Sequence, residues 1–198
     1  MNIYLKNERN EWEYYENVSV EELDKRNIKI GSGARIGSGA SIGSGAIIGS
    51  GALIGSEAII ESKARIGSGA SIGSGAIIGS GARIESKASI GSGAIIGSWA
   101  SIGSGAIIGS GASIGSGASI GQKAELNGKT DCIVLVPIGS RNSMLTGYLQ
   151  EGKLMLGTGC FIDEEKEFLE KLEKTHGDNE HAKRYKSAIK FFKENLRI

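Results

Sequence analysis

The sequence predicts a mainly β fold, a triangular parallel β-solenoid with 18-residue coils, followed by a small α/β domain at the C-terminus. Three observations predict it. An aliphatic residue returns every six positions from Ile30 to Leu126. Alanine keeps the same period from Ala34 to Ala124. A six-residue period matches neither an amphipathic helix nor a simple strand alternation. The period stops after Leu126, where the C-terminal domain is expected to begin.

The residues before the period are expected to cap the first coil, because a solenoid exposes unpaired strand edges at both ends. Residues 11–16 have a strand-like composition. Ser19 stands three residues before Glu22, which is the spacing of a capping box, so a short helix is expected there. The predicted units are 1–29 (N-terminal cap with a short helix), 30–126 (solenoid) and 127–198 (C-terminal β-sheet plus two helices).

The repeating unit is Ile-Gly-Ser-Gly-Ala-X. Alternation along Ala-X-Ile places Ala and Ile inside and X outside. Gly-Ser-Gly turns the chain, because glycine adopts backbone angles that other residues avoid. Each buried isoleucine contributes about 1.5–3 kcal/mol. This strict register distinguishes the chain from a flexible Gly/Ser linker, although it contains 32 glycines.

On these residues, the repeat resembles that of the hexapeptide-repeat left-handed β-helix family, which includes many acyltransferases. The resemblance covers residues 30–126 and implies a left-handed coil, which the spacing alone does not show. Enzymes of that family use a histidine as general base and have loops that interrupt the coils. Residues 30–126 contain no His, no Cys and no insertion. Acid–base catalysis in the coils is therefore not expected.

The outward X positions form three faces, and one of them carries a stripe of isoleucines. Sorting by 18 places Ile59, Ile77 and Ile95 in one row between Ser41 and Ser113. Exposed apolar stripes indicate a contact surface. We expect a homo-oligomer, a dimer or the trimer that the family resemblance implies, packed on these three isoleucines. Two alternatives remain: the C-terminal helices fold back onto the stripe, or β-branched residues simply suit strands.

In some turns another residue replaces a glycine of the Gly-Ser-Gly turn sequence. Trp99 replaces a turn glycine, and an exposed tryptophan at a corner is suited to anchor either a partner or the chain's own terminal domain; we favour packing within the same chain. Glu61 and Glu85 replace another turn glycine, but they are not separated by a multiple of 18, so a paired-carboxylate site is not supported.

Beyond the period the pattern changes to that of a small sheet with two helices. Strands are expected at 132–136, 144–149 and 153–161, with Glu151-Gly152 as a hairpin turn. Asp163 is expected to cap the first helix, which ends at Gly177. Asp178 or Asn179 caps the second helix. Its apolar stripe is Ala182, Tyr185, Ile189, Phe192 and Leu196.

The C-terminal segment resembles a domain of uncharacterised phage and bacterial hexapeptide proteins, and this resemblance implies no assigned activity. It rests on Gly139-Ser140-Arg141-Asn142, Leu145-Thr146, Gly159-Cys160-Phe161 and His176-Gly177-Asp178-Asn179. The candidate site here is Arg141, Cys160 and His176, with the histidine activating the thiol as a nucleophile. The alternative is structural: a turn arginine, a packed cysteine and a histidine at a helix C-terminus.

The composition and the charge pattern argue against several classes of protein. The 23 basic and 22 acidic residues nearly cancel, so nucleic acid and membrane surfaces are not expected partners. The charged N-terminus does not match a secretory signal. No apolar run reaches the roughly 18 residues of a membrane helix. We expect a cytoplasmic protein with Cys132 and Cys160 as free thiols, no metal and no cofactor.

The expected function is that of a non-catalytic structural or interaction protein and not of an enzyme. It would be a rigid solenoid rod that self-associates and is capped by its C-terminal domain. The alternative is a ligand-binding or enzymatic C-terminal domain on a solenoid spacer. Ice binding is less favoured, because the outward ladders contain Ser and Ile but no Thr.

Overall fold

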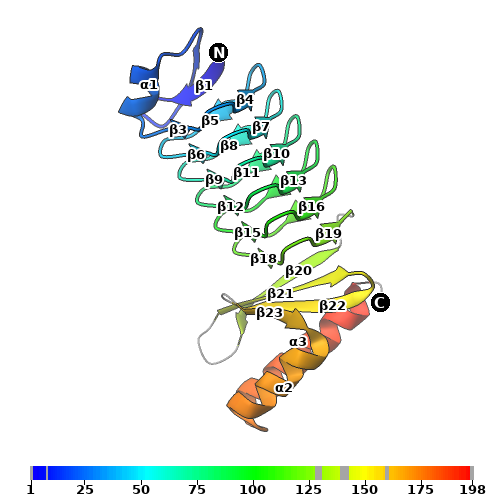
Figure 1. Cartoon of the computed structure of the whole chain (residues 1–198). Helices are drawn as coiled ribbons and strands as arrows, with labels where there is room; N and C mark the ends of the chain where they lie inside the picture. Colours follow the sequence, from blue (N-terminus) through cyan, green and yellow to red (C-terminus); the bar gives the residue numbers. More distant parts are fainter. Residues whose placement is uncertain (1, 8, 128–130, 139–142, 159–160, 197–198) are drawn as a thin grey trace.

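The computed structural model describes residues 2–7, 9–127, 131–138, 143–158 and 161–196. Figure 1 shows an elongated molecule with a small N-terminal cap, a stack of regular coils, and a sheet with two helices at the far end. The predicted fold class is confirmed: a parallel β-solenoid with a small α/β C-terminal domain.

The coils consist of two-residue parallel strands that pair in register with strands 18 residues away, as Ile77 does with Ile59 and Ile95. Three sheets result. The first has the order β17-β14-β11-β8-β5-β1-β2, in which β1 (Ile3–Lys6) and β2 (Trp12–Tyr15) come from the N-terminal cap. The second has the order β19-β16-β13-β10-β7-β4, and the third β18-β15-β12-β9-β6-β3. The strand bounds are β3 (Lys29–Ile30), β4 (Arg35–Ile36), β5 (Ser41–Ile42), β6 (Ile47–Ile48), β7 (Leu53–Ile54), β8 (Ile59–Ile60), β9 (Arg65–Ile66), β10 (Ser71–Ile72), β11 (Ile77–Ile78), β12 (Arg83–Ile84), β13 (Ser89–Ile90), β14 (Ile95–Ile96), β15 (Ser101–Ile102), β16 (Ile107–Ile108), β17 (Ser113–Ile114), β18 (Ser119–Ile120) and β19 (Glu125–Leu126).

The inside of the coils is a continuous core of stacked Ala and Ile, and every alanine from Ala40 to Ala124 is buried. The turns explain the glycines. A Cβ on Gly43 would lie 2.4 Å from the backbone nitrogen of Ser62 in the next coil, so the first turn position favours glycine. The third position has positive φ, as at Gly51 (66°), which glycine adopts without strain.

Trp99 also has positive φ (62°). The ring lies on Gly81 of the preceding coil, where a Cβ would be 2.7 Å from the ring carbons. Trp99 remains 69% exposed. Trp99 therefore packs within the chain as expected, but on the preceding coil.

At the N-terminal end, β1 (Ile3–Lys6) pairs in parallel with β5 and antiparallel with β2 (Trp12–Tyr15). Helix α1 (Val20–Lys25) follows, and the hydroxyl of its N-cap Ser19 accepts a hydrogen bond from the Glu22 backbone N–H. Lys6 forms an ion pair of 2.9 Å with Glu61, which ties β1 to a coil corner.

At the C-terminal end, a four-stranded antiparallel sheet lies between the last coil and two helices (Figure 1). Alternate residues of the sheet separate cleanly: Val134 and Met155 pack on the solenoid core, whereas Leu145 and Leu156 pack on the helices. The element bounds are β20 (Cys132–Ile138), β21 (Ser143–Gln150), β22 (Lys153–Thr158), β23 (Phe161–Glu164), α2 (Glu165–His176) and α3 (Glu180–Asn195).

One of these bounds, the start of α2, differs from expectation. Asp163 does not cap α2, because it lies in the short strand β23, and the N-cap is Glu164. The predicted apolar stripe of α3, from Ala182 to Leu196, is buried as expected. Asn179 caps α3 by accepting from the backbone N–H groups of His181 and Ala182.

Candidate functional site

Of the three residues predicted as a C-terminal site, the structure describes His176. Arg141 and Cys160 lie outside the described residues. His176 is the last residue of α2, and its ring centroid lies 5.7 Å from that of His181 and 6.3 Å from that of Tyr185. The site of Arg141, Cys160 and His176 therefore stays a prediction.

Two adjoining hollows lie on the C-terminal domain, where β22, β23 and the helices meet. Their volumes are about 460 and 570 Å³. They share Glu165, Leu169 and Lys193, so they form one open groove, which we call the helix groove. The other lining residues are Gly152, Lys153, Leu154, Glu164 and Lys166 in the first hollow, and Lys186, Ile189, Lys190 and Glu194 in the second.

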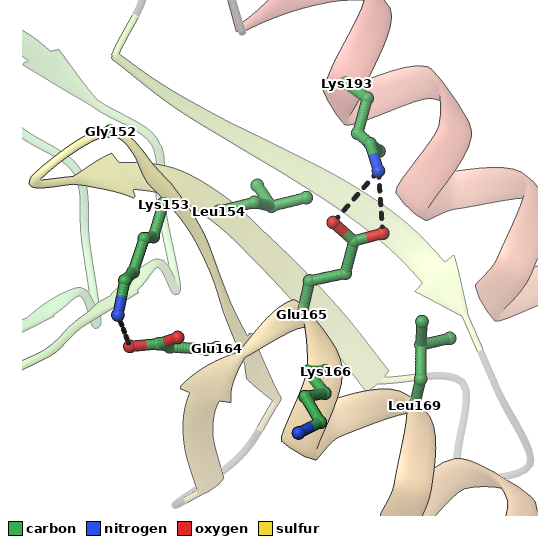
Figure 2. A pocket seen from close by; sticks show the side chains of 8 residues that line it. All are labelled: Gly152, Lys153, Leu154, Glu164, Glu165, Lys166, Leu169 and Lys193. Atoms are coloured by element: carbon green, nitrogen blue, oxygen red, sulfur yellow. Dashed lines mark hydrogen bonds and ion pairs between the residues drawn. The ribbon is translucent and has the colours of Figure 1, made fainter.

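Charged side chains from different elements meet in the helix groove. In Figure 2, Lys193 reaches from α3 to Glu165 at the start of α2, with N–O distances of 3.0 and 3.1 Å. Lys153 donates a 2.7 Å hydrogen bond to Glu164, which raises the pKa of Lys153. In the parts of the chain that the structure describes, Lys166 forms no ion pair. Leu154 and Leu169 provide an apolar floor.

The groove lining suits binding better than catalysis. Its titratable side chains are lysines and glutamates, without a histidine or a thiol. Cys132, the free thiol that the structure describes, is partly buried against the solenoid core, and desolvation raises its pKa to about 12, so it is a poor nucleophile. No group of three or more His, Cys, Asp or Glu within the described ranges has the geometry of a metal site.

The predicted isoleucine stripe stands on the first sheet, where Ile59, Ile77 and Ile95 pair in register. Ile95 is 47% exposed, and the other two are half-buried. The helix pair packs on the C-terminal sheet and not on this stripe, so the fold-back alternative is wrong. The interface on Ile59, Ile77 and Ile95 stays a prediction.

Sequence reasoning missed the helix groove. Its residues come from four elements, β22, β23, α2 and α3, whose packing the sequence pattern did not determine. The available signal was the pair Glu165 and Lys193, which stand at the beginning of one predicted helix and the end of the next. An antiparallel helix pair brings such ends together.

Three comparisons relate the chain to known proteins. The family model for the bacterial transferase hexapeptide (six repeats) matches residues 27–62, 51–86 and 87–122. No curated protein matches the chain. Among the described residues, no helix is both long enough and apolar enough to cross a membrane.

Several solved structures have similar coils. Perosamine N-acetyltransferase from Caulobacter crescentus is 23% identical over 52% of this chain and 50% of its own, with a TM-score of 0.46. The acetyltransferase domain of PglB from Neisseria gonorrhoeae is 22% identical over 52% of both chains, also at 0.46. UDP-N-acetylglucosamine acyltransferase from Francisella novicida is 18% identical over 50% of this chain and 52% of its own, at 0.29. This chain thus spans about half of each.

The expectation of a non-catalytic structural rod is corrected by the family match, because the model that matches these repeats describes a bacterial transferase hexapeptide. The expectation rested on the absence of His and Cys from residues 30–126. That absence concerns the coils alone, whereas the helix groove lies on the C-terminal domain. The alternative, a functional C-terminal domain on a solenoid spacer, fits better.

Proposed function

Because this chain belongs, through residues 27–122, to the bacterial transferase hexapeptide family, we propose that its C-terminal domain is the functional part, carried on the solenoid as a rigid support. Its function is to bind an anionic small molecule with an apolar portion. The observation that carries the proposal is the helix groove, where lysines surround a short apolar floor.

The charge of the groove sets the class of ligand. Five lysines and three glutamates line the two hollows. Glu164 and Glu165 are each engaged by a lysine, and the Lys190 Nζ lies 3.9 Å from Glu194. Lys166 is left to meet a phosphate or carboxylate, while Leu154, Leu169 and Ile189 accept an apolar chain. Coenzyme A combines these properties. It is bound in the solved structure of perosamine N-acetyltransferase, and acetyl coenzyme A is bound in that of the PglB domain. Acetyl coenzyme A is therefore the first probe.

The test compares acetyl coenzyme A binding by calorimetry in three proteins. The double variant Lys166→Glu/Lys190→Glu places a negative charge in each hollow and should weaken binding roughly tenfold or more. Lys174→Glu, on the exposed part of α2 away from the groove, is the matched control and should bind like the parent. Equal losses in both variants, or no binding by the parent, would sink the proposal.

A second candidate is acyl transfer, and the family match favours it. The coils supply no histidine or cysteine. Any base or nucleophile would come from the C-terminal domain, where Arg141, Cys160 and His176 remain the proposed residues. The measurement is thiol release from acetyl coenzyme A with amino sugars as acceptors. An activity that survives both His176→Ala and Cys160→Ala would exclude this assignment.

We further propose the domain boundaries, the association and the cellular compartment that the sequence predicts. The chain divides at residues 29 and 126, copies associate as a dimer or trimer on the isoleucine stripe, and the compartment is the cytoplasm. The register supports association, because Ile59 and Ile95 flank Ile77 symmetrically, so that two antiparallel copies would place isoleucine on isoleucine.

A further inference from the structure

The third sheet carries two stacked arginines. Arg65 and Arg83 occupy outward positions of β9 and β12 and are direct partners in the parallel register. Both are exposed. Within the described ranges, neither forms an ion pair with an acidic side chain. Like charges directly opposite on neighbouring strands are destabilising, so the folded protein gains nothing from this pair.

The fold does not require arginine at these positions. The next two outward positions of the same sheet are Ser101 and Ser119, with the same backbone pairing. Arginine presents a rigid fork of donors that binds carboxylate, sulfate or phosphate groups with two hydrogen bonds. Two such forks on neighbouring coils, about 4.8 Å apart, form an anion-binding row.

Two corner lysines lengthen the row. Lys63 stands at the corner before Arg65, and Lys87 at the corner after Arg83, and both are exposed. The four cations therefore cross the face diagonally from one corner to the other. Of the carboxylates in the same two turns, Glu61 is neutralised by Lys6 at 2.9 Å. Glu85 is then the one remaining carboxylate of these two turns, compared with the four positive charges of the row.

Trp99 adds a flat apolar surface beside this row. Its ring lies on Gly81, two residues before Arg83, and Ser101, two residues after Trp99, pairs with Arg83. One side of the ring is therefore against backbone and the other is open, in agreement with its 69% exposure. Trp99 is also the one aromatic residue in the sequence between Tyr15 and Tyr148.

We propose that Lys63, Arg65, Arg83, Lys87 and Trp99 form a binding surface for an acidic polysaccharide. Carboxylate or sulfate groups of successive sugars bind the cation row, and one sugar ring packs its C–H face on the indole, whose electron-rich face attracts such bonds. The rise of one coil is close to the length of one sugar ring in an extended chain. This surface is separate from the helix groove and does not depend on the function proposed there.

The shape of the surface selects a polymer over a small molecule. Small ligands bind in concave sites that bury most of their surface, whereas the two arginines stand on flat, in-register strands, with the lysines and Trp99 at the corners beside them. The aromatic content argues against nucleic acid. Single-stranded nucleic acid binds to several aromatic side chains that stack successive bases, and these coils contain Trp99 alone.

The test measures the binding of polygalacturonate, a polymer of uronate sugars, with neutral dextran as the blank. The variant Arg65→Ser/Arg83→Ser should weaken binding roughly tenfold or more, since each arginine loses a charge-assisted contact. Trp99→Gly should weaken it a few-fold. Both changes introduce the residue that other coils carry at the same position, so the parent melting temperature should be retained.

Arg35→Ser is the matched control, because Arg35 is an exposed outward arginine on the second sheet. It should bind polygalacturonate like the parent. An equal loss in this control would overturn the proposed surface. So would the absence of binding by the parent at low salt. Tighter binding of an oligothymidylate that also depends on Trp99 would overturn the polysaccharide and assign the surface to nucleic acid.

Discussion

The two ends of the solenoid are closed in different ways. At the N-terminal end, β1 continues one of the three sheets by main-chain pairing with β5, and the other two sheets begin without such a strand. At the C-terminal end, a whole sheet lies across the coil. Thr146 Oγ1 accepts from the backbone N–H of Ser119 at 3.1 Å, and Tyr148 Oη accepts from that of Gly121 at 2.9 Å.

The difference between the two ends also appears in how deeply the core side chains of the first and last coils are buried. Ile30 and Ile36 of the first coil are half-buried, whereas Ile120 and Leu126 of the last coil are 2% and 0% exposed. Side-chain acceptors on a covering sheet thus satisfy a strand edge and exclude water, while one added strand satisfies one edge alone. We expect substitutions at the closed end and in the middle to cost more than those at the open end.

The largest effect is expected in the middle of the core. Ile78→Asp buries a charge among stacked aliphatic side chains, which costs more than about 5 kcal/mol and should prevent folding. Ile36→Asp, at the open end, lets the carboxylate reach water and should leave a folded protein with a lower melting temperature. Circular dichroism melts measure both. Parent-like melting of both variants would show that the isoleucines do not point inward.

A smaller effect is expected at the covering sheet. Tyr148→Phe removes the acceptor of the Gly121 N–H and leaves this partly buried group without a partner, so the free energy of unfolding should fall by about 1–3 kcal/mol. Tyr14→Phe, on exposed β2, is the control and should change little. Urea titration measures both. A parent-like midpoint for Tyr148→Phe would mean that the hydroxyl is not needed to close this end.

The N-terminal cap should be worth still less. Lys6→Ala removes the ion pair with Glu61 and the cation–π contact with Trp12, whose centroid lies 4.8 Å from Nζ. The expected loss is about 1 kcal/mol. Lys29→Ala, an exposed lysine on β3, is the matched control. If both variants unfold at the same urea concentration, the Lys6 contacts do not stabilise the cap.

Outside the core, no stability change is expected. Ile77→Lys alters a half-buried outward position and should leave the melting temperature within about 2 °C of the parent, since surface changes cost less than about 0.5 kcal/mol. In the proposed assembly it should lower the mass measured by light scattering. A protein that is monomeric both before and after the change would end the interface proposal for Ile59, Ile77 and Ile95.

The regular part of the fold could be predicted because one period fixes strand, turn and inward face together. The apolar stripe of α3 was predictable for the same reason. Strand β23 was not, since Asp163 and Glu164 suggest a helix start, and only pairing with β22 makes them a strand. The helix groove needed the packing of β22, α2 and α3, which no local pattern contains.

The contact of Trp99 with Gly81 also limits how the gene for this protein can grow. Tandem duplication of the 18-residue segment that ends with Trp99 would place two tryptophans at the same corner of neighbouring coils. The later ring would then lie on a tryptophan, whereas the Trp99 ring now lies on Gly81, where a Cβ would be 2.7 Å from the ring. Such a copy would be counter-selected. Duplication of two coils, with glycine at this corner in one of them, would be tolerated, so lengthening of the repeat around this corner is expected to proceed in steps of two coils.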